Sequence, residues 1–196
     1  MAKKLINEKW LNLACGQIRV DHLNPTTQQK DGTFFGIDVA KTEAADAVMD
    51  LEWFPWDIES NSAEEIICSH YVEHVPDLIK FMDEVYRILS PKVVDADGTE
   101  HGGRIKVICP YYMSIRCWQD PTHKRAISEA TFLYFNKAWR DANKLDHYGI
   151  KSDFDFTYGY DMSQEWSSRS QEARDFAMKH YFNVINDIHV VLTKRS

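Results

Sequence analysis

Two short segments place residues that can hold a nucleoside at the ends of apolar runs. The run Leu11-Asn12-Leu13 leads into Ala14-Cys15-Gly16, and further along Phe35-Gly36-Ile37 leads into Asp38. Small residues let a ligand approach backbone amides closely, and a carboxylate accepts hydrogen bonds from a ribose diol. If both runs are neighbouring parallel strands, these residues lie on one edge of a sheet, and we predict a nucleoside-containing cofactor there.

A second chemically rich segment is Asp120-Pro121-Thr122-His123-Lys124-Arg125. It supplies an acid, two cations and an imidazole that titrates near neutral pH. His123 is the first candidate for a general base if a substrate must lose a proton. The alternative is a solvated turn in which Lys124 and Arg125 face water and His123 only holds the loop.

The histidines at positions 70 and 74 raise the possibility of a metal site, because residues four apart can share a helix face. The acid Glu73 directly precedes the second histidine, however, whereas a zinc-protease helix requires the order H-E-x-x-H. The cysteines lack the paired spacing of a zinc site and the density of a disulfide scaffold; they are Cys15, Cys68, Cys109 and Cys117. We therefore expect no bound metal and reduced thiols.

Short apolar runs alternate with helical periodicity along the first half of the chain, which predicts βαβ units and a largely parallel sheet. The expected strands cover residues 10–15, 33–38, 47–50, 64–69 and 104–109, and the expected helix covers 77–89. The segment between Gly16 and Thr33 is short and polar and contains Asn24-Pro25, so the usual first crossover helix is expected to be stunted or absent.

The second half is richer in aromatic residues and predicts two more helices and a late pair of strands. The helices are expected over 129–144 and 164–180, and the strands over 154–158 and 187–194. This pair would extend the sheet at one edge. Residues 92–101 are expected to form an inserted hairpin or loop with Asp97-Gly98 as its turn.

Composition limits the classes of protein that remain. A chain of 196 residues that is 44% hydrophobic suits one domain spanning residues 1–196. The net charge of −7 argues against broad contact with a phosphate backbone. No run approaches the roughly 18 apolar residues of a membrane span, and no apolar signal core follows the basic start. We expect a cytoplasmic protein without a membrane partner.

An ordered series of motifs carries a resemblance to a known family. The motifs are Leu11-Asn12-Leu13-Ala14-Cys15-Gly16, Gly36-Ile37-Asp38, Asp50-Leu51, Ser69-His70-Tyr71-Val72-Glu73-His74, Arg87-Ile88-Leu89-Ser90-Pro91 and Gly102-Gly103. Over about residues 10–110 the chain resembles the class I S-adenosylmethionine-dependent methyltransferases, and among them the small, type-11-like members. The segment 120–125 also resembles one found in a subset of these proteins. Two departures are Ala14 and Gln17 where glycines are common, and the insertion that separates Pro91 from Gly102.

This resemblance implies a Rossmann-like α/β fold with a mostly parallel sheet and a late antiparallel edge strand. It also implies a cofactor-binding half over 10–110 and an acceptor-side half over 111–196. S-adenosylmethionine, with S-adenosylhomocysteine as its product, is the implied cofactor. The implied cofactor residues are Ala14, Cys15 and Gly16 beside the methionine part, Asp38 at the ribose, Asp50 and Leu51 at the adenine, and Ser69 and His70 at the methionine end.

The acceptor side is expected to follow the fifth strand. We predict that Tyr111, Tyr112 and Trp118 line an acceptor pocket together with Lys124 and Arg125, and that His123 is the catalytic candidate. The sequence Cys109-Pro110-Tyr111-Tyr112 resembles the loop that holds a flipped base in amino-group DNA methyltransferases, but it follows the fifth strand instead of the fourth.

A methyltransferase acting on a small molecule is therefore favoured over two alternatives. The first alternative is a non-catalytic partner or sensor subunit that binds the cofactor. The second is a nucleic-acid methyltransferase. The sequence identifies neither the methyl acceptor nor the oligomeric state, since this fold hosts many chemistries.

Overall fold

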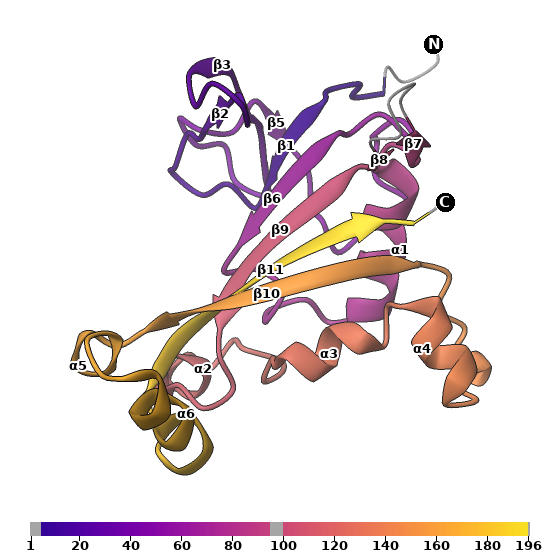
Figure 1. Cartoon of the computed structure of the whole chain (residues 1–196). Helices are drawn as coiled ribbons and strands as arrows, with labels where there is room; N and C mark the ends of the chain where they lie inside the picture. Colours follow the sequence, from indigo (N-terminus) through magenta and orange to yellow (C-terminus); the bar gives the residue numbers. More distant parts are fainter. Residues whose placement is uncertain (1–4, 95–99, 196) are drawn as a thin grey trace.

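The computed structural model describes residues 5–94 and 100–195, which build a twisted seven-stranded sheet (Figure 1). Across the sheet the strands lie in the order β5, β4, β1, β6, β9, β11, β10. Their bounds are Trp10–Leu13 for β1, Phe35–Asp38 for β4, Ala47–Val48 for β5, Glu65–Ser69 for β6, Arg104–Pro110 for β9, Phe154–Met162 for β10 and Ile185–Lys194 for β11. Each of them overlaps a strand expected from the apolar runs.

The directions of the strands confirm the predicted Rossmann-like α/β class. Strands β5, β4, β1, β6 and β9 pair in parallel, whereas β11 pairs antiparallel with both β9 and β10. The late antiparallel pair therefore lies at one edge of the sheet. The chain moves outward from β1 to β4 on one side and from β6 to β9 on the other. In such a sheet the point of reversal, here between β1 and β6, is where ligands bind, at the carboxyl ends of the strands.

Helix α1 (Leu78–Ile88) covers one face of the sheet. It begins because the Asp77 side chain accepts a hydrogen bond from the Lys80 amide at 3.0 Å, and it ends before the extended Leu89. Its buried stripe includes Phe81, Met82, Val85 and Ile88. These side chains join one apolar core with strand residues of the sheet. Burying each such side chain stabilises the fold by about 1.5–3 kcal/mol.

The helices of the second half are shorter than the sequence predicts. They are α2 (Ile115–Gln119), α3 (Glu129–Leu133), α4 (Lys137–Ala142), a 3-10 turn η1 (Asp146–Tyr148), α5 (Gln164–Ser167) and α6 (Gln171–His180). The single helix expected over 129–144 is wrong, because the Asn136 side chain accepts from the Trp139 amide and starts a new helix there. The helix expected over 164–180 is likewise two, since Ser170 caps α6 through the Ala173 amide.

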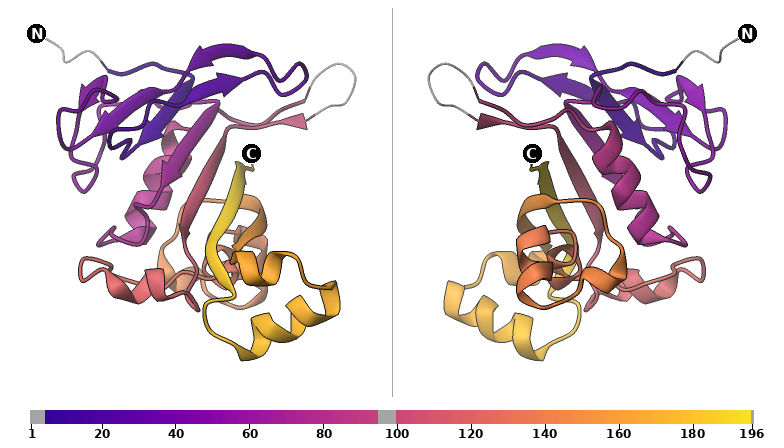
Figure 2. Two further views of the ribbon diagram at one scale, coloured as in Figure 1. Left: turned by 90° about the vertical axis from the view of Figure 1, so that its left-hand side faces the viewer. Right: turned by 90° about the vertical axis from the view of Figure 1, so that its right-hand side faces the viewer.

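The first crossover helix is absent, as the polar segment between Gly16 and Thr33 predicts, and a hairpin that the sequence did not indicate takes its place. Strands β2 (Asp21–Leu23) and β3 (Lys30–Thr33) pair with each other. His22 stacks on Trp10 with ring centroids 3.9 Å apart, and a Cβ atom on Gly32 would lie 2.0 Å from that indole ring. The described chain has no helix before α1. The face of the sheet opposite α1 is therefore bare of helices along the middle of β6, β9 and β11 (Figures 1 and 2).

A network of charges occupies this helix-free face. The buried Glu65 carboxylate accepts a hydrogen bond from the Arg104 Nε atom at 2.8 Å and pairs with the Lys106 ammonium at 2.6 Å. Glu65 pairs with Arg104 in register across the parallel strands. Cross-strand ion pairs of this kind give the buried carboxylate cationic partners, so this face of the sheet can stay in contact with solvent without an unpaired buried charge.

The inserted segment forms a hairpin, as expected. Strands β7 (Val93–Val94) and β8 (Glu100–His101) are antiparallel, and the predicted turn at Asp97-Gly98 lies outside the described residues. Among the described helices none has the length and apolar character needed to cross a membrane.

Candidate cofactor and acceptor site

The residues predicted for the cofactor lie at the carboxyl ends of neighbouring strands. Ala14 directly follows β1, Asp38 ends β4, Asp50 comes shortly after β5, and Ser69 ends β6. The parallel pairing of β1 with both β4 and β6 brings these ends to one edge of the sheet. This is the edge where ligands of open α/β sheets bind.

The turn after β1 is bonded directly to the acid at the end of β4. The Gly16 amide donates a hydrogen bond to Asp38 Oδ2 at 2.9 Å, and the Ala40 amide donates to Asp38 Oδ1 at 3.0 Å. Each carboxylate oxygen has two lone pairs, so the carboxylate keeps acceptor capacity after both bonds. A diol is the type of group that this remaining capacity can bind.

The turn itself holds two residues in the left-handed region, Ala14 with φ 54° and Gly16 with φ 55°. A Cβ atom added to Gly16 would meet nothing within 4 Å, so that side of the turn faces open space. Left-handed backbone costs a residue with a Cβ about 1–2 kcal/mol. Such strain persists where surrounding contacts over-determine it, which is frequent at ligand sites.

A pocket of about 350 Å³ lies beside this turn. Four of the predicted cofactor residues line it: Ala14, Asp38, Asp50 and Leu51. The other lining residues were not predicted, and they are Val39, Met49, Glu52 and Tyr71. All four adjoin a predicted cofactor residue in the sequence, so adjacency to the predicted residues at the strand ends is the signal that could have found them. The volume is within the range of about 300–1,000 Å³ typical of small-molecule sites.

Cys15 does not line this pocket through its side chain. Its thiol is buried in a small cluster with Ala44 and Ala45, and burial raises its pKa. Any contact of Cys15 with a cofactor would therefore come from its backbone. Cys15 lies at the corner after β1, and its side chain packs against the neighbouring loop.

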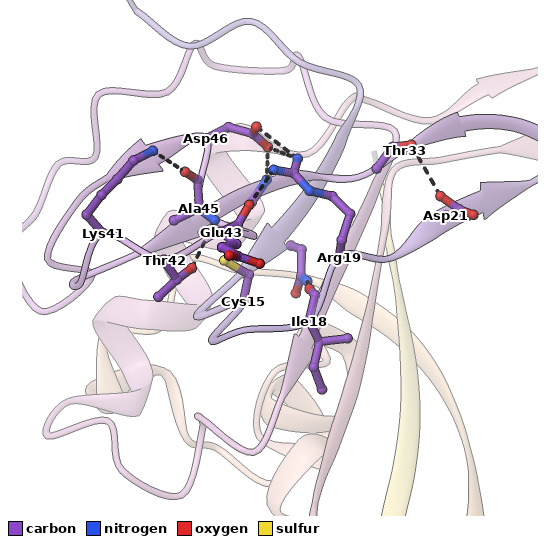
Figure 3. Close-up of polar contacts among 12 residues, drawn as sticks. Cys15, Ile18, Arg19, Asp21, Thr33, Lys41, Thr42, Glu43, Ala45 and Asp46 are labelled. Atoms are coloured by element: carbon purple, nitrogen blue, oxygen red, sulfur yellow. Dashed lines mark hydrogen bonds and ion pairs between the residues drawn. The ribbon is translucent and has the colours of Figure 1, made fainter.

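An ion pair and hydrogen bonds from Arg19 join that loop, residues 39–46, to the segment after β1 (Figure 3). Arg19 donates to both carboxylate oxygens of Asp46, at 2.8 and 2.7 Å, and to the Glu43 carbonyl oxygen at 2.9 Å. Asp46 also accepts from the Gly36 amide of β4 at 2.8 Å. Burial raises the pKa of Asp46, but the hydrogen bonds from Arg19 and the Gly36 amide, together with the nearby positive charges, outweigh burial and hold the pKa below its ordinary value. The loop thus fixes the corner in the absence of a crossover helix.

At the other end of the edge, His70 has a left-handed backbone with φ 53°. Its amide donates to the Ile108 carbonyl oxygen at 2.7 Å. Its ring atom Nδ1 lies 3.6 Å from Glu73 Oε1, and this contact raises the pKa of His70. Ser69 is partly buried at the end of β6. Neither residue lines the pocket of Ala14 and Asp38.

The predicted acceptor aromatics differ widely in exposure. Tyr111 is buried and packs edge-on against Tyr112 and Tyr160, with centroids 4.7 and 5.3 Å away. Burial raises the pKa of its phenol. Trp118 is 62% exposed, and its indole nitrogen donates to the Tyr112 carbonyl oxygen. Tyr111 is thus a core residue, while Tyr112 and Trp118 offer exposed aromatic surface.

The segment 120–125 packs against the turn that precedes α1. His123 is nearly buried, and its Nδ1 atom lies 2.8 Å from the Cys117 carbonyl oxygen. Lys124 is exposed, and its amide donates to the Glu73 carbonyl oxygen. Arg125 donates to the Pro76 carbonyl oxygen at 2.9 Å, and burial lowers the pKa of its guanidinium. The segment is therefore a packed element and not a wholly solvated turn.

A larger hollow of about 720 Å³ lies elsewhere, lined by residues such as Trp10, His22, Glu65 and Arg104. Trp10, Glu65 and Arg104 begin their strands, so this hollow is at the amino ends. Ligands of parallel sheets bind at the opposite ends, and none of the predicted site residues lines it. We therefore take the smaller pocket as the candidate cofactor site.

Comparison with known proteins agrees with this fold. Residues 11–94 match the sequence model of a methyltransferase domain. No curated protein matches the chain. The matched segment holds strands β1 (from Leu11 on), β4, β5 and β6 and helix α1, so it includes the strand ends that line the candidate site.

Solved structures of low sequence identity share the fold. A SAM-dependent methyltransferase from Archaeoglobus fulgidus superposes with a TM-score of 0.59 at 14% identity, covering 95% of this chain and 86% of its own. A putative methyltransferase of Haloferax volcanii, solved in complex with the Trm112 methyltransferase activator, gives 0.56 at 14% identity and covers 98% and 84%. The YcgJ protein from Bacillus subtilis gives 0.53 at 16% identity and covers 98% and 94%.

Proposed function

We propose that the chain transfers a methyl group from S-adenosylmethionine to a small-molecule acceptor. The observation that carries this proposal is the Asp38 carboxylate, which lines a pocket at the reversal point of the sheet and is oriented by the Gly16 amide. When bound, the cofactor supplies an electrophilic methyl carbon on a sulfonium. The protein then needs to bind the cofactor and the acceptor, orient them toward each other, and keep water away from the reacting atoms.

In this proposal, each part of the cofactor is bound by residues at the end of a different strand. Asp38 accepts hydrogen bonds from the ribose hydroxyls, and Asp50 and Leu51 flank the adenine. The open side of Gly16 and the backbone of Ala14 and Cys15 lie beside the methionine part. Ser69 and His70 close the methionine end. Support for this arrangement comes from the pocket lining and from the parallel register of β1 with β4 and β6.

The acceptor half, residues 111–196, supplies the other side of the site in this proposal. Tyr112 and Trp118 present aromatic surface, and Lys124 and Arg125 present positive charge. His123 is the candidate catalytic residue: its Nδ1 atom is engaged by the Cys117 carbonyl oxygen, which leaves Nε2 to take a proton from an acceptor. A small acceptor is favoured over nucleic acid by the net charge of −7. The four free thiols fit a reducing, cytoplasmic location.

The first experiment is a calorimetric titration of the wild-type protein with S-adenosylmethionine and S-adenosylhomocysteine. Saturable binding of both is expected. The second follows the labelled methyl group from S-adenosylmethionine into a pool of metabolites and, in parallel, into a pool of RNA and DNA. Label in the metabolite fraction supports the proposal, and label only in nucleic acid overturns the choice of acceptor. Binding without transfer to either pool would favour the non-catalytic alternative.

The role of His123 is tested by a pair of variants. His123→Ala is expected to lower turnover by at least ~100-fold while changing cofactor affinity less than threefold, about 0.6 kcal/mol. His147→Ala removes an exposed imidazole outside the site and should change neither quantity. Equal losses of turnover and affinity in His123→Ala would place His123 in the cofactor site instead.

A further inference from the structure

A buried carboxylate without a hydrogen bond lies close to the predicted acceptor side. Glu73 is 1% exposed, and neither Oε1 nor Oε2 accepts a hydrogen bond from any group in the described part of the chain. Two imidazoles lie just beyond bonding distance, with His70 Nδ1 at 3.6 Å and His123 Nε2 at 4.0 Å from Oε1. An unpaired buried charge costs several kcal/mol, so such a group normally has a cation as its partner.

Of the two ring nitrogens of His123, the one that lies near the Glu73 carboxylate is Nε2. The other, Nδ1, lies 2.8 Å from the Cys117 carbonyl oxygen, which can only accept, so Nδ1 carries the proton. In the neutral ring Nε2 then has a free lone pair. A histidine that ligates a metal usually donates its other ring N–H to a carbonyl or carboxylate in this way.

His74 is held in the same tautomer by a short relay. The Thr122 hydroxyl donates to Asp120 Oδ1 at 2.7 Å, and its oxygen lies 2.9 Å from His74 Nδ1. Since the hydroxyl proton points to the carboxylate, the hydroxyl oxygen accepts from His74 Nδ1–H. Nε2 of His74 is therefore also free as a ligand. The two imidazole rings meet edge-on with centroids 4.7 Å apart.

We propose that Glu73, His74 and His123 bind a divalent metal ion of the zinc type, through a carboxylate oxygen and the two Nε2 atoms. One ligand atom from each residue lies within 4.8 Å of the others. Ligand bonds of about 2.0–2.2 Å place such atoms roughly 3.3 Å apart around a tetrahedral ion. Small side-chain rotations close this difference. Two histidines and one carboxylate leave a fourth position open, as in catalytic zinc sites.

An ion pair between Glu73 and His123 without a metal explains the position of His123 less well. If His123 were charged, its Nε2–H would be expected to donate to Glu73 at about 2.7–2.9 Å, whereas the two atoms are 4.0 Å apart. His123 joins Glu73 and His74 only in the folded chain. The spacing of His70 and His74 in the sequence predicts no metal, and it carries no signal for a set that includes His123.

The site adjoins the acceptor side of the proposed function but can be tested apart from it. A metal ion at this position would occupy His123 Nε2 and would replace the proton-accepting role proposed above for His123, while the proposed cofactor residues would keep their roles. Metal binding is measured without S-adenosylmethionine and without an acceptor. Failure of the metal site would therefore leave methyl transfer intact, and failure of methyl transfer would leave the metal site intact.

The experiment titrates chelator-treated full-length protein with Zn²⁺ in competition with a chromophoric chelator. One Zn²⁺ per chain is expected, with a Kd below about 1 µM. His74→Ala, His123→Ala and Glu73→Gln should each weaken binding by more than the ~10–100-fold typical of a lost outer-shell partner. Thr122→Val, which removes the relay, should weaken it by about 10-fold, and His147→Ala should have no effect.

Two further readouts separate a ligand role from a structural one. Zn²⁺ should raise the melting temperature of the wild-type protein but not that of Glu73→Gln, and circular dichroism checks that this isosteric variant is folded. Co²⁺ should give visible bands without the near-ultraviolet absorption of a thiolate ligand. The proposal would be overturned if the wild-type protein showed no saturable binding, or if all three ligand variants bound Zn²⁺ as tightly as the wild type. A thiolate band from a cysteine ligand would also overturn it.

Discussion

The Gly16 amide and the Asp38 carboxylate are joined across 2.9 Å, which links the turn after β1 to the end of β4. The bond orients one oxygen of the acid toward the corner, while Ala40 holds the other. A carboxylate fixed in this way has little conformational freedom left to lose when it binds a ligand. Pre-organisation of this kind improves affinity by lowering the cost of ordering.

Asp38→Asn is expected to weaken S-adenosylmethionine binding by at least ~10-fold. Hydrogen bonds to a charged group contribute about 1.5–3 kcal/mol, and the amide is uncharged and has one acceptor oxygen in place of two. Calorimetric titration measures the change. Asp21→Asn, at an exposed acid of the β2–β3 hairpin, is the matched control and should bind as the wild type does. Unchanged affinity in Asp38→Asn would mean that the ribose is held elsewhere.

Gly16→Val is expected to abolish cofactor binding while the fold survives. The new side chain would extend into open space beside the turn, where the methionine part of the ligand is proposed to lie, and the left-handed backbone would cost about 1–2 kcal/mol. Gly149→Val provides a close control, because Gly149 also has a positive φ and no neighbour within 4 Å of an added Cβ. It should lose similar stability by thermal melting and keep cofactor affinity. Retained binding in Gly16→Val would reduce the corner to a structural turn.

Ala14→Gly is expected to stabilise the protein by roughly 0.5–1 kcal/mol. The methyl group of Ala14 is held at φ 54°, which costs about 1–2 kcal/mol, and the added chain entropy of glycine offsets part of the gain. Urea unfolding compares the variant with wild type. Ala130→Gly, in helix α3, should instead destabilise by about 1 kcal/mol. A loss of stability in Ala14→Gly would show that the methyl group packs favourably enough to outweigh the strain.

The Glu65 ion pairs predict a specific dependence of stability on pH. Burial raises the pKa of Glu65, but the hydrogen bonds from Lys106 and Arg104 outweigh burial and leave the pKa below its ordinary value. A lowered carboxyl pKa contributes stability that is present above the unfolded pKa of 4.5 and is lost as the pH falls through the folded value. Glu65→Gln should therefore be less stable than wild type at pH 7, by about 1–3 kcal/mol.

This difference is measured by urea unfolding from pH 7 down through the acid range. It should shrink as Glu65 becomes protonated in the wild-type protein. Glu64→Gln changes an exposed neighbour whose partner Lys9 is also exposed, and it should alter stability by less than ~0.5 kcal/mol at every pH. A Glu65→Gln effect that is the same at pH 7 and in acid would mean that packing, and not charge, is responsible.

Much of this protein follows from local patterns in its sequence. Apolar runs that stop at small or acidic residues determined the parallel strands and the edge where Ala14, Asp38, Asp50 and Leu51 meet. The apolar stripe from Phe81 to Ile88 determined α1. The polar segment before Thr33 indicated that the first crossover helix is missing. These features depend on periodicity, turn chemistry and strand ends, all of which act over short distances along the chain.

Tertiary structure alone decided which distant groups meet. The turn with Glu73 and His74 meets His123 because the segment after α2 packs against it. Tyr71, which follows the left-handed His70, joins strand-end residues distant in sequence in lining the candidate cofactor pocket. The Cys15 side chain packs against Ala44 and Ala45 of the loop after β4 and does not line the pocket. Such contacts depend on packing between elements far apart in sequence, and burial then determines whether a carboxylate such as Glu73 needs a cation.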